Sequence, residues 1–317
     1  MAAKLVTIFG GSGFIGRHLV RALAKDGWRI RVAVRRPDLA GHLQPLGGVG
    51  QIHAVQANLR YRDSIAHALI GADAVVNLVG ILHESGRQNF ASVQTQGARF
   101  VAEEAARAGI TNFVQLSAIG ADENSASDYA RTKALGEKAV LAAVPGAVIL
   151  RPSIVFGPED KFFNRFADLA RFTPFLPLIG GGETKFQPVF VGDVAEAARR
   201  ALSGGAKAGA TYELGGPEVA SFKHLLEFIL ETTVRKRLLL PVPFALAKLK
   251  ASVLEKLPGK LLTVDQVTLL ESDNIVSAAA AKESRTLEGL GITTSSYEAI
   301  VPSYLYSFRP HGQFARA

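Results

Sequence analysis

Residues 5–24 read LVTIFGGSGFIGRHLVRALA, and this stretch decides the fold. Leu5–Phe9 is a short apolar run that predicts a buried strand, and the residues after the glycines have the apolar spacing of a helix. Between them Gly10, Gly13 and Gly16 are spaced G-x-x-G-x-x-G. In such a loop one glycine permits the tight turn, one admits a pyrophosphate to the backbone, and one lets helix and strand pack closely. The loop therefore predicts a dinucleotide site, with an ordinary glycine turn as the alternative.

Strands and helices continue to alternate through the first half of the chain. We expect strands at 29–34, 51–56, 74–79, 113–116 and 147–150, and helices at 64–69, 98–108 and 129–143. This order predicts an α/β, Rossmann-type doubly wound parallel sheet with a smaller, mostly helical C-terminal region. We expect residues 1–155 plus about 187–210 to form the dinucleotide-binding domain, and residues 156–186 and 211–317 to form the smaller region.

The composition excludes several classes of protein. Of 317 residues, 48% are apolar and 20% are charged, as in folded globular proteins. No run of apolar residues is long enough for a transmembrane helix, and the first residues lack the features of a signal peptide. Cysteine is absent, which excludes disulfides and thiolate chemistry, and the seven histidines are scattered, so we expect no metal site.

The end of the second expected strand selects the cofactor. An acidic residue there would bind the ribose hydroxyls of NAD, but this chain has Arg35 and Arg36, followed by Asp38. Two guanidinium groups suit the 2′-phosphate of NADP. The alternatives are a pair of arginines on a solvated loop, and NAD bound through Asp38.

Tyr129 and Lys133 lie four residues apart, on one face of an expected helix. Such a pair occurs often by chance, but here it opens the helix that follows the fifth strand, and Ser117 lies just past that strand. Ligands of open parallel sheets bind beyond the carboxyl ends of the strands. A tyrosine with a pKa of about 10 is a poor acid–base group at neutral pH, and a neighbouring lysine with an oxidised nicotinamide would favour the phenolate. The three residues either catalyse a reaction or only bind the cofactor. Nearby, His83 and Glu84 are expected to lie in a solvated loop.

A basic segment lies near the end of the chain. Residues 235–260 contain seven lysines and arginines and only one acid, Glu255. This segment therefore carries most of the chain's net charge of +8. Within the segment, apolar residues recur at helical spacing, namely Leu246, Leu249, Val253, Leu254 and Leu257. We expect a helix that docks on an anionic membrane surface or a partner; the alternative is a helix packed on its own domain. Aromatic residues are not interleaved with the charges, so nucleic acid is disfavoured.

Several motifs, in this order, resemble the extended and atypical short-chain dehydrogenase/reductases. They are TIFGGSGFIGRHLVRAL, the strand end at 77–80, LSA at 116–118, Y-x-x-x-K, LRPSIVFG and VFVGDV. A closer resemblance is to the accessory subunit of respiratory complex I (NADH:ubiquinone oxidoreductase) that retains this fold, in its bacterial form. That resemblance rests on LQPLGGVGQ, VNLVG, ALGEKA, PSIVFGPEDKFFNRF and QPVFVGDV.

This resemblance implies tightly bound NADPH without turnover, in a peripheral subunit on the cytoplasmic face of the bacterial inner membrane, near the junction of the two arms of the complex. The implied cofactor contacts are Gly10, Ser12, Gly13, Phe14, Ile15, Gly16, Arg35, Arg36, Val79, Gly80, Ser117, Tyr129, Lys133, Pro152 and Ser153. Only 11 residues separate Ser117 from Tyr129, where epimerases of the superfamily have a longer segment. A free-standing NAD(P)-dependent oxidoreductase or epimerase and a sensor of the NADP pool stay open as alternatives.

Overall fold

The structure is a computed structural model, and it describes residues 3–256 and 262–312. The chain forms two compact units. The first comprises residues 1–152, 191–214 and 277–293, and the second comprises residues 153–190, 215–276 and 294–317. Residues 211–214 and 277–293, which the sequence analysis placed in the smaller region, therefore lie in the first unit.

The first unit is built on a seven-stranded parallel sheet in the order β11-β6-β5-β4-β1-β2-β3. The bounds are β1 Leu5–Phe9, β2 Arg29–Val34, β3 Ile52–Gln56, β4 Ala74–Asn77, β5 Asn112–Leu116, β6 Val148–Pro152 and β11 Thr211–Leu214. The chain leaves β1 in one direction for β2 and returns on its other side for β4. This reversal is the point at which doubly wound sheets bind ligands. The predicted fold class is confirmed.

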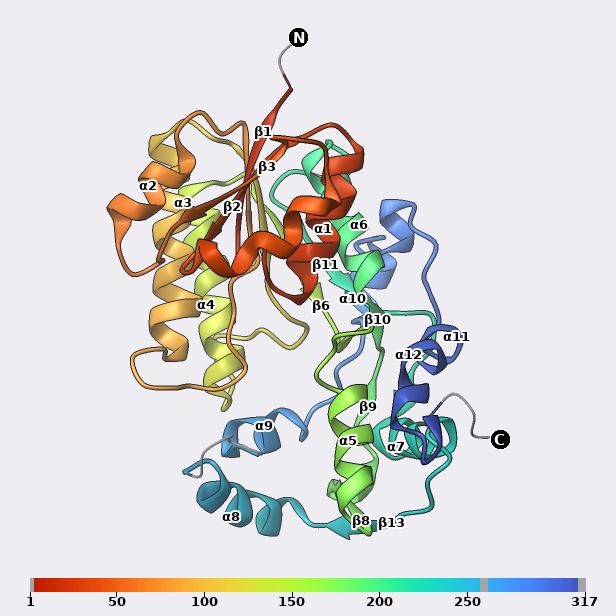
Figure 1. The fold of residues 1–317 in the computed structure, drawn as a ribbon. Coiled ribbons are helices and arrows are strands. Elements are labelled where there is room, and N and C mark those ends of the chain that lie inside the picture. Colours follow the sequence, from red (N-terminus) through yellow and green to blue (C-terminus); the bar gives the residue numbers. More distant parts are fainter. Residues whose placement is uncertain (1–2, 257–261, 313–317) are drawn as a thin grey trace. The chain divides into compact units, whose positions relative to one another are not determined.

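Helices cover both faces of this sheet (Figure 1). Their bounds are α1 Phe14–Lys25, η1 Pro37–Leu46, α2 Arg62–Leu69, η2 Ala91–Gln96, α3 Gly97–Arg107, α4 Asp128–Ala143, α6 Val191–Leu202, α10 Ala278–Lys282 and η4 Glu288–Leu290. Helices α2, α3 and α4 lie on one face, and α1 packs beside α6 on the other. The apolar side chains of each helix recur every three or four residues, so one stripe is buried against strands that are buried on both faces.

The second unit contains three small two-stranded sheets and several helices. Its strands are β7 Val155–Phe156, β8 Phe175–Ile179, β9 Lys185–Phe186, β10 Val189–Phe190, β12 Ala220–Ser221 and β13 Leu238–Val242. Its helices are α5 Phe163–Phe172, η3 Gly180–Gly182, α7 Phe222–Thr232, α8 Phe244–Leu254, α9 Val264–Leu269, α11 Tyr297–Ile300, α12 Pro302–Leu305 and η5 Tyr306–Phe308. Ser221 caps α7 by accepting a hydrogen bond from the His224 amide at 3.1 Å.

Aromatic side chains form the core of the second unit. Phe163 is fully buried and packs edge-on against Phe156 and Phe162, with ring centroids 6.0 and 5.2 Å apart. The ring of Tyr297 stacks on Phe163 at 6.0 Å. Such ring pairs contribute about 0.5–1.5 kcal/mol beyond their burial. The core therefore does not depend on Leu246, Leu249 and Val253 of α8, which are exposed.

The expected basic segment, 235–260, contains β13 and α8, and its last residues, 257–260, lie outside the described residues. In the described part of α8 the two alanines Ala247 and Ala251 are buried, whereas Leu249 and Val253 are 66% and 61% exposed. The sequence alone left open a docking helix or a helix packed on its own domain. In the structure, Leu249 and Val253 are not packed on the domain, which favours the docking helix. Within the described residues, no helix is long and apolar enough to cross a membrane.

Candidate functional site: a dinucleotide loop and a buried lysine

The loop after β1 turns at Gly10, which has a φ of +79°. This left-handed conformation favours glycine. Its amide donates to the Ala33 carbonyl at 3.2 Å, and a Cβ there would lie 3.2 Å from Cγ2 of Val79. Gly10 is therefore the turn glycine, and it brings the loop against Val79 at the end of β4.

The other two glycines have different roles. A Cβ on Gly16 would lie 2.5 Å from the backbone carbonyl of Gly11, so Gly16 is the packing glycine. Gly13 precedes α1 with φ −77° and ψ −176°, an extended conformation open to any residue. A side chain at Gly13 would therefore not strain the backbone through its angles, and it would meet only the Gly10 carbonyl oxygen, at 3.2 Å.

The N-terminus of α1 has the features of an anion site. The helix has 12 residues, no acidic residue in its first turn and no side-chain cap. Gly13 is exposed, and Ser12, Phe14 and Ile15 beside it are half-buried. Amides of the first turn lack partners within a helix and carry its positive dipole, which suits a phosphate.

The two arginines after β2 differ. The Arg36 guanidinium donates to the Asp38 carboxylate at 3.0 and 2.7 Å, which raises the pKa of Arg36 and lowers that of Asp38. Arg35 is exposed and has no hydrogen bond or ion pair within residues 3–256 and 262–312. Arg35 can therefore meet an anion directly, whereas Arg36 must exchange Asp38 for it.

Ser117 and Lys133 are both buried beyond the end of β5. The Ser117 hydroxyl oxygen has no hydrogen-bond partner in the described part of the chain, although nearly all buried polar groups have one. The Lys133 Nζ donates to the Leu116 carbonyl at 3.3 Å, and a Cβ on Gly80 would lie 3.2 Å from that Nζ. Burial lowers the pKa of Lys133 to about 8, against the opposing charge of Glu137. An orphaned hydroxyl and an ammonium without an ion pair are groups that a bound ligand could satisfy.

Tyr129 lies in the first turn of α4, capped by Ser127, whose hydroxyl accepts from the Ala130 amide at 3.3 Å. The Phe90 ring meets the Tyr129 ring edge-on at 5.9 Å, and the Lys133 Nζ lies 5.9 Å from the Tyr129 ring centre. The structure thus groups Tyr129 and Lys133 with Phe90.

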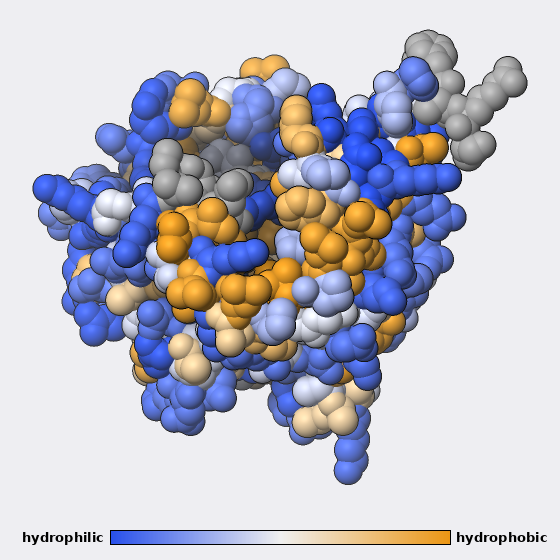
Figure 2. Space-filling model, turned by 90° about the horizontal axis from the view of Figure 1, so that it is seen from below, coloured by the Kyte–Doolittle hydropathy of each residue, from blue (hydrophilic) through white to orange (hydrophobic). Residues whose placement is uncertain are grey.

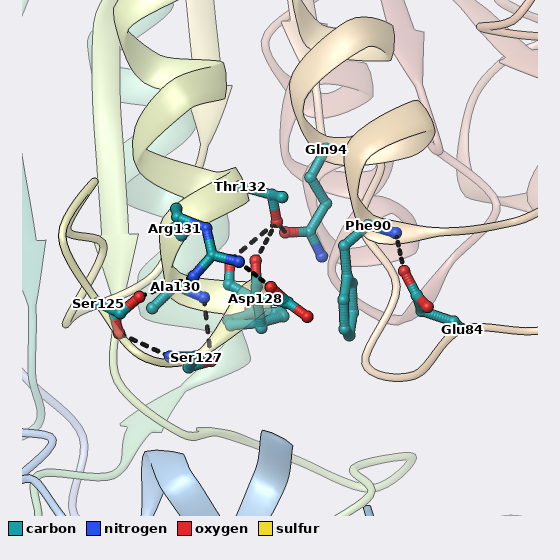
Figure 3. Close-up of polar contacts among 10 residues, drawn as sticks. Glu84, Phe90, Gln94, Ser125, Ser127, Asp128, Ala130, Arg131 and Thr132 are labelled. Carbon is teal, nitrogen blue, oxygen red and sulfur yellow. Dashed lines mark hydrogen bonds and ion pairs between the residues drawn. The ribbon is translucent and has the colours of Figure 1, made fainter. Parts of the chain in front are cut away.

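Two features around Tyr129 were missed in the sequence. One is the π-helical segment η2, where the Gln94 side chain accepts from the Thr132 hydroxyl at 3.2 Å (Figure 3). The same side chain donates to the Ile81 carbonyl at 2.8 Å. The other is Glu84, whose carboxylate accepts from the Phe90 amide at 2.7 Å, as Figure 3 also shows, while His83 is exposed. No local pattern reveals the contact between Gln94 and Thr132, because the two residues are 38 positions apart in the chain.

The last two implied contacts fall at a boundary. The Pro152 carbonyl, at the end of β6 in the first unit, accepts from the Ile119 amide at 3.0 Å. Ser153 begins the second unit, where its hydroxyl donates to the side-chain and backbone oxygens of Asn274 at 2.6 and 2.9 Å. The Ser153 hydroxyl is therefore already bonded within the second unit.

These residues fit a nicotinamide dinucleotide. The uncapped start of α1 suits the pyrophosphate, and the absence of a side chain at Gly13 leaves room for it. Within the described residues, the Ser117 hydroxyl has no hydrogen-bond partner, so a ligand can bond to it. Among the described residues, no group of three or more histidine or carboxylate side chains could hold a metal ion.

Comparison with known proteins agrees with this geometry. Residues 6–215 match the NAD dependent epimerase/dehydratase family, and the chain belongs to that family. A solved structure, DesIV (dTDP-glucose 4,6-dehydratase) from Streptomyces venezuelae with NAD and TYD bound, has the same fold. Its TM-score is 0.72 at 20% identity, and the match covers 95% of each chain.

Two curated relatives sharpen the comparison. The mitochondrial NADH dehydrogenase (ubiquinone) 1 alpha subcomplex subunit 9 of Arabidopsis thaliana is 35% identical, over 97% of this chain and 79% of that protein. The ceramide reductase of Caulobacter vibrioides is 39% identical, but over 56% of this chain and 55% of that protein. The resemblance inferred from the motifs is confirmed.

Proposed function

We propose that this protein is an NADP(H)-binding accessory subunit of respiratory complex I, in which the cofactor mainly stabilises the fold and the assembly. The observation that carries the proposal is the 35% identity with a subunit of NADH dehydrogenase (ubiquinone) along 97% of the chain, including the second unit. Its partners would be the complex I subunits near the junction of the two arms. It would lie peripherally on the cytoplasmic face of the bacterial inner membrane, where the anionic membrane surface would be a further contact.

The chain's own residues would hold the cofactor in three places. The amides at the start of α1 would bind the pyrophosphate, with Gly13 leaving room for it. Arg35 would bind the 2′-phosphate of NADP, which favours NADP over NAD. Tyr129 and the buried Lys133 would bind the nicotinamide ribose. When bound, the nicotinamide ring supplies the capacity for hydride transfer.

A structural role is supported by the short stretch between Ser117 and Tyr129. This stretch is held by local turns, in which Asp122 accepts from the Asn124 amide at 2.9 Å. It leaves no long segment of the kind that epimerases of the superfamily place there.

A free-standing reductase is the second candidate. It is favoured by the retained set of Ser117, Tyr129 and Lys133 and by the partial match to the ceramide reductase. In that case Ser117 would hold the substrate carbonyl, and Tyr129 would move the proton at its oxygen.

The deciding experiment is a native gel of solubilised membranes from the source cells. We expect the protein to migrate with NADH dehydrogenase activity, and Tyr129→Phe to leave this migration intact, because it removes one hydrogen bond worth about 1 kcal/mol. If Tyr129→Phe instead produces a metabolic defect while the respiratory complex assembles and works normally, the proposed role as a subunit is wrong and the protein is a free-standing reductase.

A further inference from the structure

A continuous set of large apolar side chains is exposed on the second unit, on β8, β13, α8 and the end of α5. We call it the apolar face, and its members are Phe172, Phe175, Leu238, Leu240, Leu246, Leu249 and Val253. Figure 2 shows apolar residues gathered into a broad patch with hydrophilic residues among them. Soluble monomers rarely expose contiguous apolar patches beyond a few hundred Å², and larger ones mark interaction sites.

The small sheet of the apolar face has one apolar side turned outward. In the parallel pairing of β8 with β13, Phe175 lies opposite Leu238. Both are exposed, by 46% and 70%, whereas Leu176 in the next position is fully buried. Because side chains alternate along a strand, one side of this sheet packs on the core and the other presents Phe175, Leu238 and Leu240.

Helix α8 continues the apolar face directly after β13. Leu246, Leu249 and Val253 form one exposed stripe, and Lys250 lies within it at the position one turn after Leu246. The buried side of the helix is made by Ala247 and Ala251, which pack against Ile179 and Val267. Leu249 and Val253 are therefore not needed to hold the helix in place, whereas the half-buried Phe244 packs with this buried cluster.

Positive charge surrounds the apolar face. Lys236, Lys250 and Lys256 are exposed and have no ion pair within residues 3–256 and 262–312. Beside them, burial and then the positive charges of Arg237 and Arg171 lower the pKa of Arg235. Arg171 is paired with Asp168 at 3.2 Å, and the Arg235 and Arg237 guanidinium groups each donate to a backbone carbonyl.

We propose that the apolar face is a membrane-binding surface that lays its apolar side chains into the headgroup region of an anionic bilayer, with the surrounding lysines and arginines on lipid phosphates. Apolar side chains flanked by cations, on elements too short to span, are the pattern of interfacial binding. A second copy of this chain is a poorer occupant, because a two-fold contact pairs the same patch of both copies and so brings their lysines and arginines together.

This inference rests on the proposed membrane location of the protein and adds the surface that makes contact. The test is flotation of the full-length protein with vesicles of phosphatidylcholine containing about one third phosphatidylglycerol, or of phosphatidylcholine alone. We expect binding at least about tenfold stronger to the anionic vesicles. High salt should weaken this binding without abolishing it, because salt screens the charges but does not weaken the apolar contacts.

Matched variants locate the surface. Leu249→Glu should lower binding to the anionic vesicles by at least about tenfold, whereas Ile70→Glu, at an equally exposed position of the first unit, should not. Lys250→Glu should weaken binding in low salt, and Lys282→Glu, at an exposed position on α10, should weaken it less. Equal binding to both vesicle types, or Leu249→Glu binding like the wild type, would overturn the proposal.

The native gel separates this inference from the proposed function. If the wild type fails to bind vesicles but migrates with the respiratory complex, and Leu249→Glu abolishes that migration, the apolar face docks a protein and the lipid proposal is wrong. If vesicles are bound as expected but the protein never migrates with NADH dehydrogenase activity, the membrane surface stands and the subunit assignment fails.

Discussion

The dinucleotide region of the first unit and the apolar face of the second depart in opposite ways from the usual burial of side chains. In the first unit polar groups are buried without full satisfaction: the Ser117 hydroxyl has no partner within the described residues, and Lys133 is a buried cation. In the second unit large apolar groups such as Leu238 and Leu249 are exposed to solvent. Each arrangement costs the isolated protein free energy, and each becomes favourable once the missing neighbour is bound.

This difference teaches what kind of ligand each region expects. Buried polar groups need a small molecule that brings matching polar atoms into a confined place. An exposed apolar face needs a large surface that removes it from water. The two regions can therefore be tested separately, because substitutions in one should leave the ligand of the other unaffected.

The largest effect is expected at the glycine loop. Gly13→Val should remove most of the stabilisation by NADPH, about 4 kcal/mol at a thousandfold excess over Kd, because the side chain occupies the approach of the pyrophosphate. Thermal unfolding with and without NADPH measures it. Gly41→Val, where a Cβ has nothing within 4 Å, is the control and should keep the full stabilisation. Normal NADPH binding by Gly13→Val would show that the loop is not the phosphate site.

Lys133→Met should stabilise the protein without cofactor by about 2 kcal/mol at pH 7, because it removes a buried cation. The pKa of Lys133 is about 8 in the folded protein, against an ordinary value of 10.5. Between these values the unfolded chain binds more protons, so this lysine makes stability rise with pH from about 8 to about 10.5. Below pH 8 its cost is fully present.

Urea unfolding at several pH values checks this sign. The Met variant should lose the rise, and Lys138→Met, on the same helix with a side chain 71% exposed, should keep it. A Met variant that is less stable than the wild type at pH 7 would mean that the ammonium is better satisfied than its contacts indicate.

Arg35→Ala should lower NADPH affinity about tenfold and leave NADH affinity unchanged, because it removes one charge-assisted contact to the 2′-phosphate. Calorimetry with both nucleotides measures it, and Arg29→Ala, exposed at the start of the same strand, is the control. Equal affinity of the wild type for both nucleotides would remove the argument for NADP.

The smallest effect is expected on the apolar face. Leu249→Gln should change the free energy of unfolding by less than about 0.5 kcal/mol, as exposed substitutions usually do. In contrast, Leu225→Gln on α7, where the side chain is fully buried, should unfold the second unit. A loss above 2 kcal/mol for Leu249→Gln would contradict the exposure of that side chain.

Most of the first sheet could be predicted from the sequence because short segments rich in apolar residues alternate with helical patterns along the chain. The predicted bounds of β1 and β2 agree with the structure. The candidate site could also be predicted, because the glycine spacing and the pair of Tyr129 and Lys133 are patterns of residues that are close together in the sequence.

The parts that were missed depend on distant contacts. Strand β8 contains Pro177, and Pro174 precedes it, so the local sequence does not favour a strand there. The strand forms because it pairs with β13, about sixty residues later, and such a small edge sheet tolerates proline. Likewise, a Cβ on Gly136 would lie 2.5 Å from the Gln94 carbonyl oxygen, so α4 packs closely against η2. No pattern in a single sequence predicts this close packing.

The unequal room around Gly13 and Gly16 divides mutants of one short loop into two genetic classes. At Gly16 even a methyl group would meet the Gly11 backbone at 2.5 Å, whereas at Gly13 it meets a single carbonyl oxygen at 3.2 Å. A library screened only for soluble expression would therefore retain many residues at position 13 and almost none besides glycine at position 16. A second screen for retention on an immobilised nucleotide would then reduce position 13 as well. Folded proteins without cofactor, the material needed to ask what the nucleotide does for assembly, are the clones that pass the first screen and fail the second.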